Sequence, residues 1–342
     1  MPARLQAIAG PLSLLLILAG CTAARGNTAP ADRSSASAAR ATPAGRPTPA
    51  PSHLALPPHC VISVAPWQLP QPLSREVVAA TPAGLLLAGG LDRSGNSSSV
   101  VQRLDPTSGR ASVVAHLPAA VHDAGAAMLP NQLLVIGGGA QASTSTVQQI
   151  APNGTASVAG QLPVPRSDLA AVALGATALV VGGYDGSHLQ DQVLSTRDGR
   201  AFTVVGRLPS PARYPAVATV GARAWIFGGQ ADGQPSAAIQ TITLGPARLS
   251  LAGRLPVALS DATAVALDGQ ILIIGGATAS GPSAIVWRFD PASGQVSRCG
   301  LLPHPLQDAG GAAWQGAAYL LGGEEPATVA QVIRIRLVAG AA

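Results

Sequence analysis

The sequence predicts an all-β fold in which six similar units, each of four short strands, form a closed ring. Three observations carry this prediction. A Gly-Gly pair ends an aliphatic run six times, a Leu-Pro pair recurs on the same period, and each interval of 45 to 48 residues holds four strand-like segments. Units of this kind cannot bury an apolar face alone and must pack against their neighbours. The architecture that fits is a six-bladed β-propeller.

The two repeated pairs keep one register along the chain. The glycine pairs begin at Gly89, Gly137, Gly182, Gly228, Gly275 and Gly322. The Leu-Pro pairs begin at Leu69, Leu117, Leu162, Leu208, Leu255 and Leu302, each twenty residues before its glycine pair. In the third unit, strands are expected over residues 169–174, 178–181, 192–195 and 202–205. The first strand of each unit is rich in Ala and Gly, which suits the narrow axis where inner strands converge.

Residues 1–20 have the layout of a secretory signal peptide, with Arg4 ahead of a short apolar run. The run is shorter than the roughly 20 residues that a membrane-spanning helix needs. Residues 18–21, Leu-Ala-Gly-Cys, resemble the lipobox of bacterial lipoproteins. This resemblance implies that Cys21 is lipidated and that the exported protein is anchored by lipid to the outer face of the cytoplasmic membrane. The alternative is an ordinary signal in which Cys21 is incidental.

Residues 21–58 are predicted to be a disordered tether, since they are mainly Ala, Pro, Ser, Thr, Arg and Gly and contain no aromatic residue. The propeller is assigned to residues 59–342. The formal net charge is +5, but five of the 21 basic residues lie before residue 47, opposed there only by Asp32. From residue 60 onward, 16 Arg face 15 acidic residues. A nearly neutral folded part gives no reason to expect nucleic acid as a partner.

The repeat resembles that of the kelch family, which includes galactose-oxidase-like propellers. Arg166 occupies the arginine place near the first strand, and Trp225 and Tyr319 occupy the aromatic place three residues before the glycine pair. Residues 104–106 and 289–291 fit the turn. The other four units carry leucine at the aromatic place: Leu86, Leu134, Leu179 and Leu272. The resemblance covers residues 60–342 and implies a kelch-type ring.

The sixth unit supplies only three strands, so residues 61–64 are assigned as its outer strand, which closes the ring and leaves a monomer without free edges. Cys60 and Cys299 then lie on neighbouring blades, and an even pair in an exported protein suggests a disulfide. Counted from the Leu-Pro pairs, however, the two differ by six residues, roughly 20 Å along parallel strands. A disulfide requires Cα atoms within about 7 Å. Both possibilities stay open at this point.

Six residues share the place fourteen before the glycine pair: Arg75, Asp123, Asp168, Tyr214, Asp261 and Asp308. The repeat geometry places them at one mouth of the central channel, with His122, Arg166 and Arg213 nearby. The acids suit a cation or a polyhydroxylated ligand; the alternative is a structural role in each blade, such as an Asx-type cap. Loops that break the repeat are further candidates for specificity: residues 184–188, Asp232 and Glu324-Glu325.

The function favoured by these observations is a non-catalytic surface module that presents the propeller to a protein or a glycan. The alternative is a sugar-converting enzyme similar to the kelch-type mutarotases, which needs only a few acids and bases at the mouth. No metal and no cofactor are predicted, because the Tyr and His ligands of a galactose-oxidase-like copper site do not converge by register. The Asp-box of sialidases is absent. A deep polar pocket would favour the enzyme, and a shallow face built from loops would favour the module.

Overall fold

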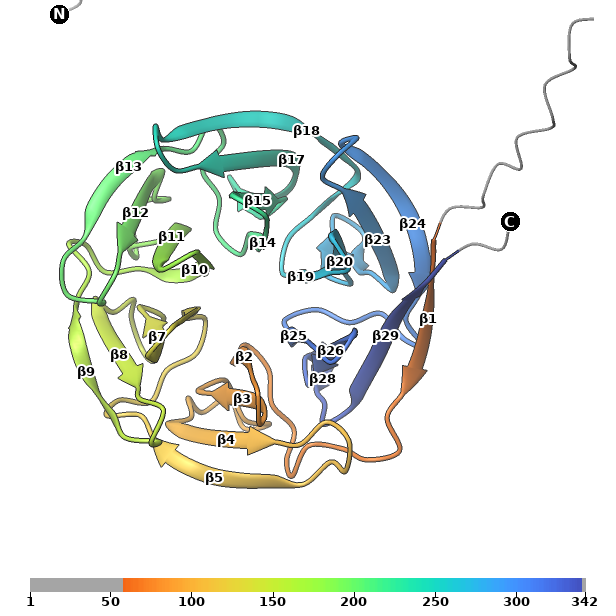
Figure 1. Ribbon diagram of the computed structural model, residues 1–342, viewed down its shortest axis with the longest axis horizontal. Coiled ribbons are helices and arrows are strands. Elements are labelled where there is room, and N and C mark those ends of the chain that lie inside the picture. The colour runs from red at the N-terminus through yellow and green to blue at the C-terminus, as the bar shows by residue number, and fades with distance from the viewer. Residues whose placement is uncertain (1–57, 340–342) are drawn as a thin grey trace, which may run out of the picture. The chain divides into compact units, whose positions relative to one another are not determined.

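The computed structural model describes residues 58–339. The predicted signal peptide, Cys21 and nearly all of the tether lie outside the described residues. Within that range, six antiparallel sheets, five of four strands and one of five, stand around a central channel (Figure 1). The predicted all-β, six-bladed fold is confirmed. Among the described residues, no helix has the length and apolarity needed to cross a membrane.

The chain builds the blades one after another, with the innermost strand first. Blades one to three contain β2 (Val77–Thr81), β3 (Gly84–Ala88), β4 (Val100–Leu104), β5 (Ala111–His116), β6 (Gly125–Leu129), β7 (Gln132–Ile136), β8 (Thr146–Ile150), β9 (Ala156–Gln161), β10 (Ser167–Leu174), β11 (Thr177–Tyr184), β12 (Gln192–Thr196) and β13 (Thr203–Arg207). Blades four and five contain β14 (Ala216–Val220), β15 (Arg223–Phe227), β17 (Gln234–Thr243), β18 (Arg248–Leu259), β19 (Thr263–Leu267), β20 (Gln270–Ile274), β23 (Ile285–Asp290) and β24 (Gln295–Leu301). Blade six contains β25 (Gly310–Trp314), β26 (Ala317–Leu321), β29 (Val332–Val338) and β1 (His59–Val64).

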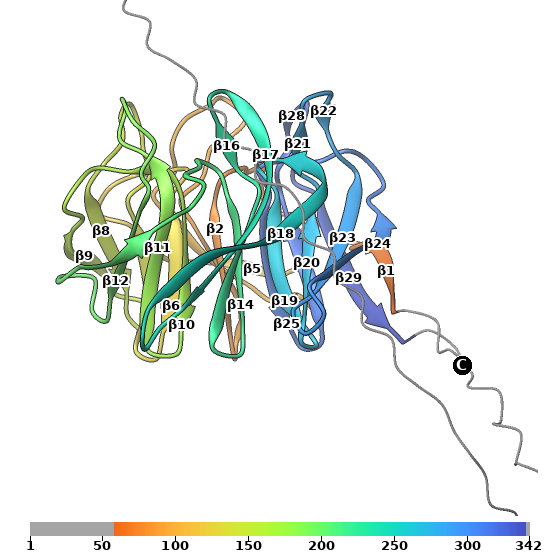
Figure 2. The ribbon, with the colours of Figure 1, turned by 90° about the horizontal axis from the view of Figure 1, so that it is seen from above.

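The two faces of the ring differ in their loops. Short hairpin strands project from one face (Figure 2): β16 (Gln230–Ala231), β21 (Ala277–Thr278), β22 (Gly281–Pro282), β27 (Glu324–Glu325) and β28 (Ala327–Thr328). We call this the mouth face, because the chain also enters each innermost strand there. The opposite face, which we call the turn face, carries the tight turns between the first and second strands and between the third and fourth strands of each blade.

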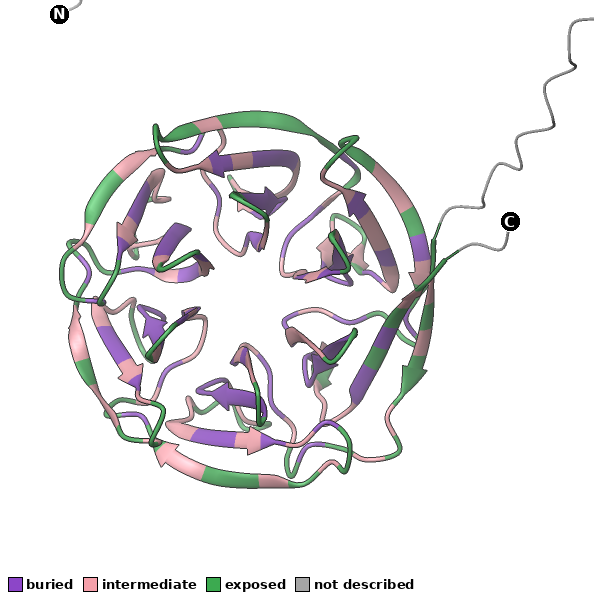
Figure 3. Cartoon of the chain, viewed as in Figure 1, coloured by how far each residue is buried: buried purple, intermediate pink, exposed green. Residues whose placement is uncertain are grey.

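Each blade interface contains one apolar cluster. The cluster between blades one and two includes Leu86 and Val101 from one side and Leu133 and Ile150 from the other. Second strands are buried nearly throughout, whereas the outermost strands are largely exposed (Figure 3). The leucine of every Leu-Pro pair is also buried in such a cluster, with exposed fractions of 4 to 6%. The repeated Leu-Pro pairs therefore mark the places where successive blades pack together.

The glycine pairs connect each blade to the next by a main-chain hydrogen bond. Gly90 N–H donates to the Val121 carbonyl at 2.8 Å, and a Cβ on Gly89 would lie 2.5 Å from the same oxygen. The backbone of Gly89 also has φ of +70°, a region that disfavours other residues. Equivalent bonds of 2.7 to 3.0 Å occur at the other five pairs. The first glycine is thus required by close approach between blades, and the second by close approach within its own blade, where a Cβ on Gly90 would lie 2.8 Å from the Ser74 carbonyl oxygen.

The N-terminal strand closes the ring as predicted. β1 pairs antiparallel with β29, with Cys60 opposite Leu337 and Val64 opposite Ile333. The structure also joins Cys60 to Cys299 by a disulfide, with the Cα atoms 5.1 Å apart. The expected 20 Å offset is wrong, because residues 65–68 separate β1 from its Leu-Pro pair whereas β24 runs directly into Leu302. Blades five and six are therefore linked covalently at their outer strands.

Candidate binding site at the channel mouth

The six residues that share one place in the repeat form a closed hydrogen-bonded ring. The backbone N–H of each donates to the carbonyl of its equivalent in the preceding blade at 2.7 to 3.3 Å, and the Arg75 N–H closes the ring on the Asp308 carbonyl at 2.8 Å. All six have φ between +51° and +59°. Aspartate tolerates this left-handed conformation better than most residues. The repeated aspartate therefore has a backbone role, different from an Asx cap, in addition to what its side chain does.

The side chain of Arg75 connects three blades across the mouth. Its Nη1 lies 3.2 Å from Asp123 Oδ2, its Nη2 lies 3.3 Å from Asp308 Oδ2, and its Nε lies 3.0 Å from Glu324 Oε1. The guanidinium carbon also stands 6.0 Å from the centroid of the Tyr214 ring, on the opposite side of the channel. Arg75 thus pairs with carboxylates of blades two and six, and one of these belongs to the loop residue Glu324.

A second cation, Arg213, lies between the aromatic side chains of Tyr184 in blade three and Tyr214 in blade four. Its guanidinium forms an ion pair with Asp168 and donates to the Tyr214 hydroxyl at 2.9 Å. The same group lies 4.8 Å from the Tyr184 ring centroid and 4.7 Å from that of Tyr214, within cation–π range. The three side chains Tyr184, Arg213 and Tyr214, all partly exposed, present rings and hydrogen-bonding groups together.

His122 and Asp261 complete the predicted set. The Nδ1 of His122 is 2.9 Å from Ser97 Oγ, and its Nε2 is 3.7 Å from Asp123 Oδ2. Burial and the charge of Arg75 lower the pKa of His122, which favours the neutral form of the ring. Asp261 accepts a short hydrogen bond from Ser260 Oγ. The structure therefore brings His122 and Asp261 into the mouth with the ring.

Carboxyl groups outnumber guanidinium groups at the mouth. Burial, with the charge of Asp168 adding to it, raises the pKa of Asp123 to about 6 although Arg75 acts in the opposite direction. Burial and the charge of Asp261 raise the pKa of Asp308 to about 8. The Asp308 side chain is only 5% exposed, and Arg75 divides its charge among three partners, so burial outweighs the ion pair. Asp308 therefore keeps its proton to a higher pH than Asp123 does.

Arg166 does not lie at the mouth, which corrects the sequence-based expectation. Its side chain, in a residue only 1% exposed, runs into the third blade and donates to the carbonyls of Gly182 and Gln192 at 3.3 and 2.8 Å. Equivalent positions in other blades hold apolar residues such as Leu73 and Val121. Arg166 therefore satisfies backbone carbonyls within the blade and is not available to a ligand.

One buried acid, Glu76, was not predicted from the sequence. Glu76 follows the ring residue Arg75, and its Oε1 accepts a hydrogen bond from the Gly310 N–H of blade six at 3.3 Å. Its Oε2 is buried without a hydrogen-bond partner among the described residues. Burial raises the pKa of Glu76 to about 8. The repeat register could have flagged it, because the other five units have Ala, Leu or Pro at this place.

The cavity framed by the ring is small, with a volume of about 170 Å³. Small-molecule sites generally enclose about 300 to 1,000 Å³. Farther along the channel, a space of about 340 Å³ is lined mainly by Ala, Val and Thr of the innermost strands. Among the described residues, no group of His, Cys, Asp and Glu is arranged to hold a metal ion. The mouth is thus a shallow polar surface above an apolar channel.

The fold and this mouth define a six-bladed β-propeller with a polar channel mouth. The family model described as the kelch motif matches residues 258–300, which correspond to blade five. A solved structure titled "Structure of YjhT" aligns with a TM-score of 0.71 at 14% sequence identity, covering 80% of this chain and 99% of that chain. This likeness supports the fold alone. No curated protein matches the sequence. The predicted six-bladed propeller is thereby confirmed, and a kelch motif is identified in blade five.

Proposed function

We propose that this protein is an exported, lipid-anchored binding module whose mouth face binds a glycan. The observation that carries the proposal is the shallow polar mouth, in which Tyr184, Arg213 and Tyr214 stand beside the aspartate ring. Sugars present hydroxyl groups that donate and accept hydrogen bonds, and faces of C–H groups that stack on aromatic rings. Arginine, carboxyl and tyrosine side chains in one partly exposed cluster match both features.

The size of the mouth supports binding at a surface. A cavity of about 170 Å³ is below the usual range of about 300 to 1,000 Å³ for sites that enclose a small molecule. The hairpins of blades four to six project beside it, which enlarges the loop-built face around the ring. A ligand that rests across this face, such as an oligosaccharide chain, suits that shape.

Export and anchoring rest on the N-terminal sequence and gain support from the disulfide. Disulfides form in oxidising compartments and are rare in the cytosol. The bond between Cys60 and Cys299 is consistent with a folded domain outside the cytoplasmic membrane. A lipid on Cys21 would hold the propeller near that membrane. Mass spectrometry of the membrane-extracted protein tests this, because a mature chain that lacks a lipid on Cys21 contradicts the anchor.

A glycan array probed with the full chain tests the binding function. Arg213→Gln is expected to lower binding at least about tenfold, because it removes a charged hydrogen-bond donor and a cation–π partner. Arg207→Gln is the matched control, since Arg207 also pairs with an aspartate but lies on the exposed outer strand β13. Binding that survives Arg213→Gln unchanged would place the site elsewhere. If no glycan binds, the ligand class is wrong, and proximity labelling would then identify a protein partner.

A sugar-converting activity is the second candidate, favoured by the raised pKa values at the mouth. With pKa values of about 6 and about 8, Asp123 and Asp308 are suited to exchange protons near neutral pH. Interconversion of sugar anomers requires an acid and a base of this kind. One-dimensional NMR of freshly dissolved sugars would detect accelerated equilibration. This candidate requires that Asp123→Asn and Asp308→Asn each slow the reaction while the propeller stays folded.

A further inference from the structure

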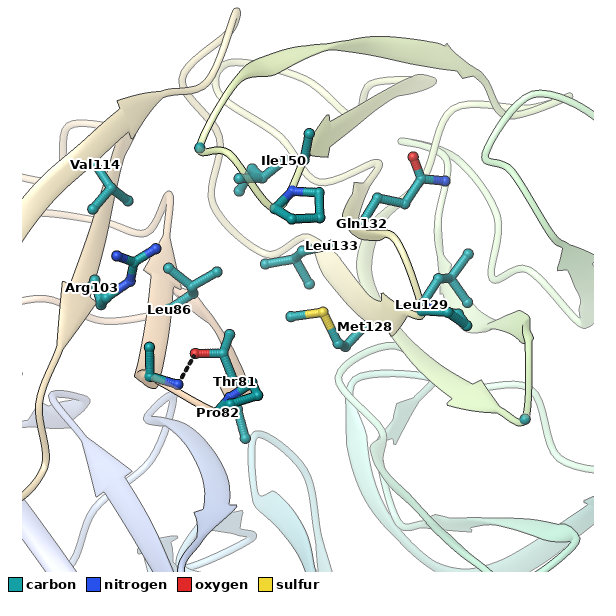
Figure 4. A pocket seen from close by; sticks show the side chains of 17 residues that line it. Thr81, Pro82, Leu86, Arg103, Val114, Met128, Leu129, Gln132, Leu133 and Ile150 are labelled. Atoms are coloured by element: carbon teal, nitrogen blue, oxygen red, sulfur yellow. Dashed lines mark hydrogen bonds between the residues drawn. The ribbon is translucent and has the colours of Figure 1, made fainter.

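A cavity of ligand-binding size lies on the turn face, away from the mouth. It has a volume of about 530 Å³ and lies between blades one and two, beside the apolar cluster that joins them. Leu86 and Arg103 stand on one side, and Met128, Leu133 and Ile150 stand on the other (Figure 4). Exposed prolines at the turns, Pro82, Pro130 and Pro152, form its rim. The cavity therefore opens at the surface and narrows toward a buried apolar floor.

Two large side chains that fill the interface between blades four and five are absent from this one. Between blades four and five, Trp225 packs on Phe289 with ring centroids 4.7 Å apart. Leu86 holds the place of Trp225 in blade one, three residues before the glycine pair. Ile150 holds the place of Phe289, since each pairs with the second-strand residue four before its glycine pair. Leu86 and Ile150 therefore occupy less volume beside this cavity than Trp225 and Phe289 occupy between blades four and five.

Arg103 is the charged side chain that lines this mainly apolar cavity. It is half-buried on β4, its Nε is buried without a hydrogen-bond partner, and it makes no ion pair or side-chain hydrogen bond with any described residue. Arg288 stands at the same place in blade five and also faces a serine across the strands. There the guanidinium donates to Ser297 Oγ at 3.1 and 3.2 Å. In blade one the equivalent Ser112 is not engaged, and the guanidinium of Arg103 stays beside the cavity.

We propose that this cavity, the blade-one pocket, binds a small amphipathic carboxylate, with the carboxylate on Arg103 and the apolar body against Leu86, Met128, Leu133 and Ile150. An arginine without a partner beside apolar walls is complementary to an anion with an apolar tail. One guanidinium neutralises one carboxylate, whereas a phosphate carries nearly two charges at neutral pH. The site is independent of the glycan-binding proposal, because it lies on the opposite face of the ring.

Titration calorimetry of the full chain with decanoate, in detergent-free buffer below the micelle concentration, tests the pocket. Saturable binding of one decanoate per chain is expected. Arg103→Gln is expected to weaken it roughly tenfold to a hundredfold, as for the loss of a charged hydrogen bond. Arg288→Gln is the matched control and is expected to leave affinity unchanged. Decan-1-ol should bind the unaltered protein as weakly as decanoate binds the Arg103→Gln variant.

Filling the pocket provides a second, independent test. Leu86→Trp restores the aromatic found in blade four and should abolish decanoate binding. Ile150→Phe, on the opposite wall, should do the same and serves if the tryptophan variant does not fold, as judged by its melting curve. The proposal is overturned if decanoate does not bind saturably, if decan-1-ol binds as tightly, if Arg103→Gln and Arg288→Gln behave alike, or if a folded filled variant still binds.

Discussion

Glu76→Gln is expected to stabilise the protein at alkaline pH and to leave it nearly unchanged in mild acid. In the folded protein, burial raises the pKa of Glu76 from 4.5 to about 8. Where the folded protein keeps a proton that the unfolded chain has lost, stability falls as pH rises. The contribution of Glu76 is therefore present in full below about pH 4.5 and is lost as pH rises to about 8. Glutamine cannot ionise and avoids this loss.

The magnitude follows from the shift. One pKa unit corresponds to about 1.4 kcal/mol, so between pH 5 and pH 9 the unaltered protein should lose roughly 4 kcal/mol of unfolding free energy through this group. Urea denaturation at both pH values measures the quantity, with the difference between variant and unaltered protein as the readout. Neighbouring acids contribute equally to both proteins and cancel in that difference. If the difference is the same at pH 5 and pH 9, Glu76 does not carry the proton inferred here.

Three further changes test how the ring is closed and how its blades are joined. Cys299→Ser should lower the unfolding free energy by about 2 to 5 kcal/mol, because the bond closes a separation of 239 residues, and an unchanged urea midpoint would contradict this. A chain that begins at Gln71 lacks β1 and exposes the β29 edge, so it should melt without a single cooperative transition; a soluble, cooperatively melting product would refute the closure. Gly89→Ala should cost roughly 2 to 4 kcal/mol, since it places a Cβ against the Val121 carbonyl at positive φ, and an unchanged melting temperature would show that the blades yield there.

The repeats allowed the frame of the molecule to be predicted because they report contacts that every blade must make. Glycine pairs mark main-chain bonds between blades, and Leu-Pro pairs mark the apolar interfaces. These requirements are the same in all six units and therefore leave a periodic trace. The predicted strands of the third unit, for example, overlap β10, β11, β12 and β13 within a few residues at each end.

The direction in which a side chain points leaves no periodic pattern in the sequence, so it was harder to predict. Arg166 lies two residues from Asp168 in the chain, yet its side chain enters the blade while that of Asp168 faces the channel. The distance between Cys60 and Cys299 depended on four residues between a strand and its Leu-Pro pair, a local detail that counting residues could not capture. The blade-one pocket could not be predicted either, because the same Leu and Ile pair occurs between blades three and four and between blades five and six, where both side chains belong to packed clusters.

The departures from aspartate in the ring have an electrostatic reason. Six carboxyl groups around about 170 Å³ would repel one another strongly in a poorly hydrated space. The two exceptions, Arg75 in blade one and Tyr214 in blade four, lie on opposite sides of the ring of six residues. The guanidinium carbon of Arg75 is 6.0 Å from the centroid of the Tyr214 side chain. They divide the four aspartates into two neighbouring pairs, and Asp168 and Asp261 each raise the pKa of the partner in their pair. Arg75 borders one aspartate of each pair, and Arg213 compensates Asp168 from outside the ring. The backbone explains why aspartate recurs, and charge balance explains why it cannot recur six times.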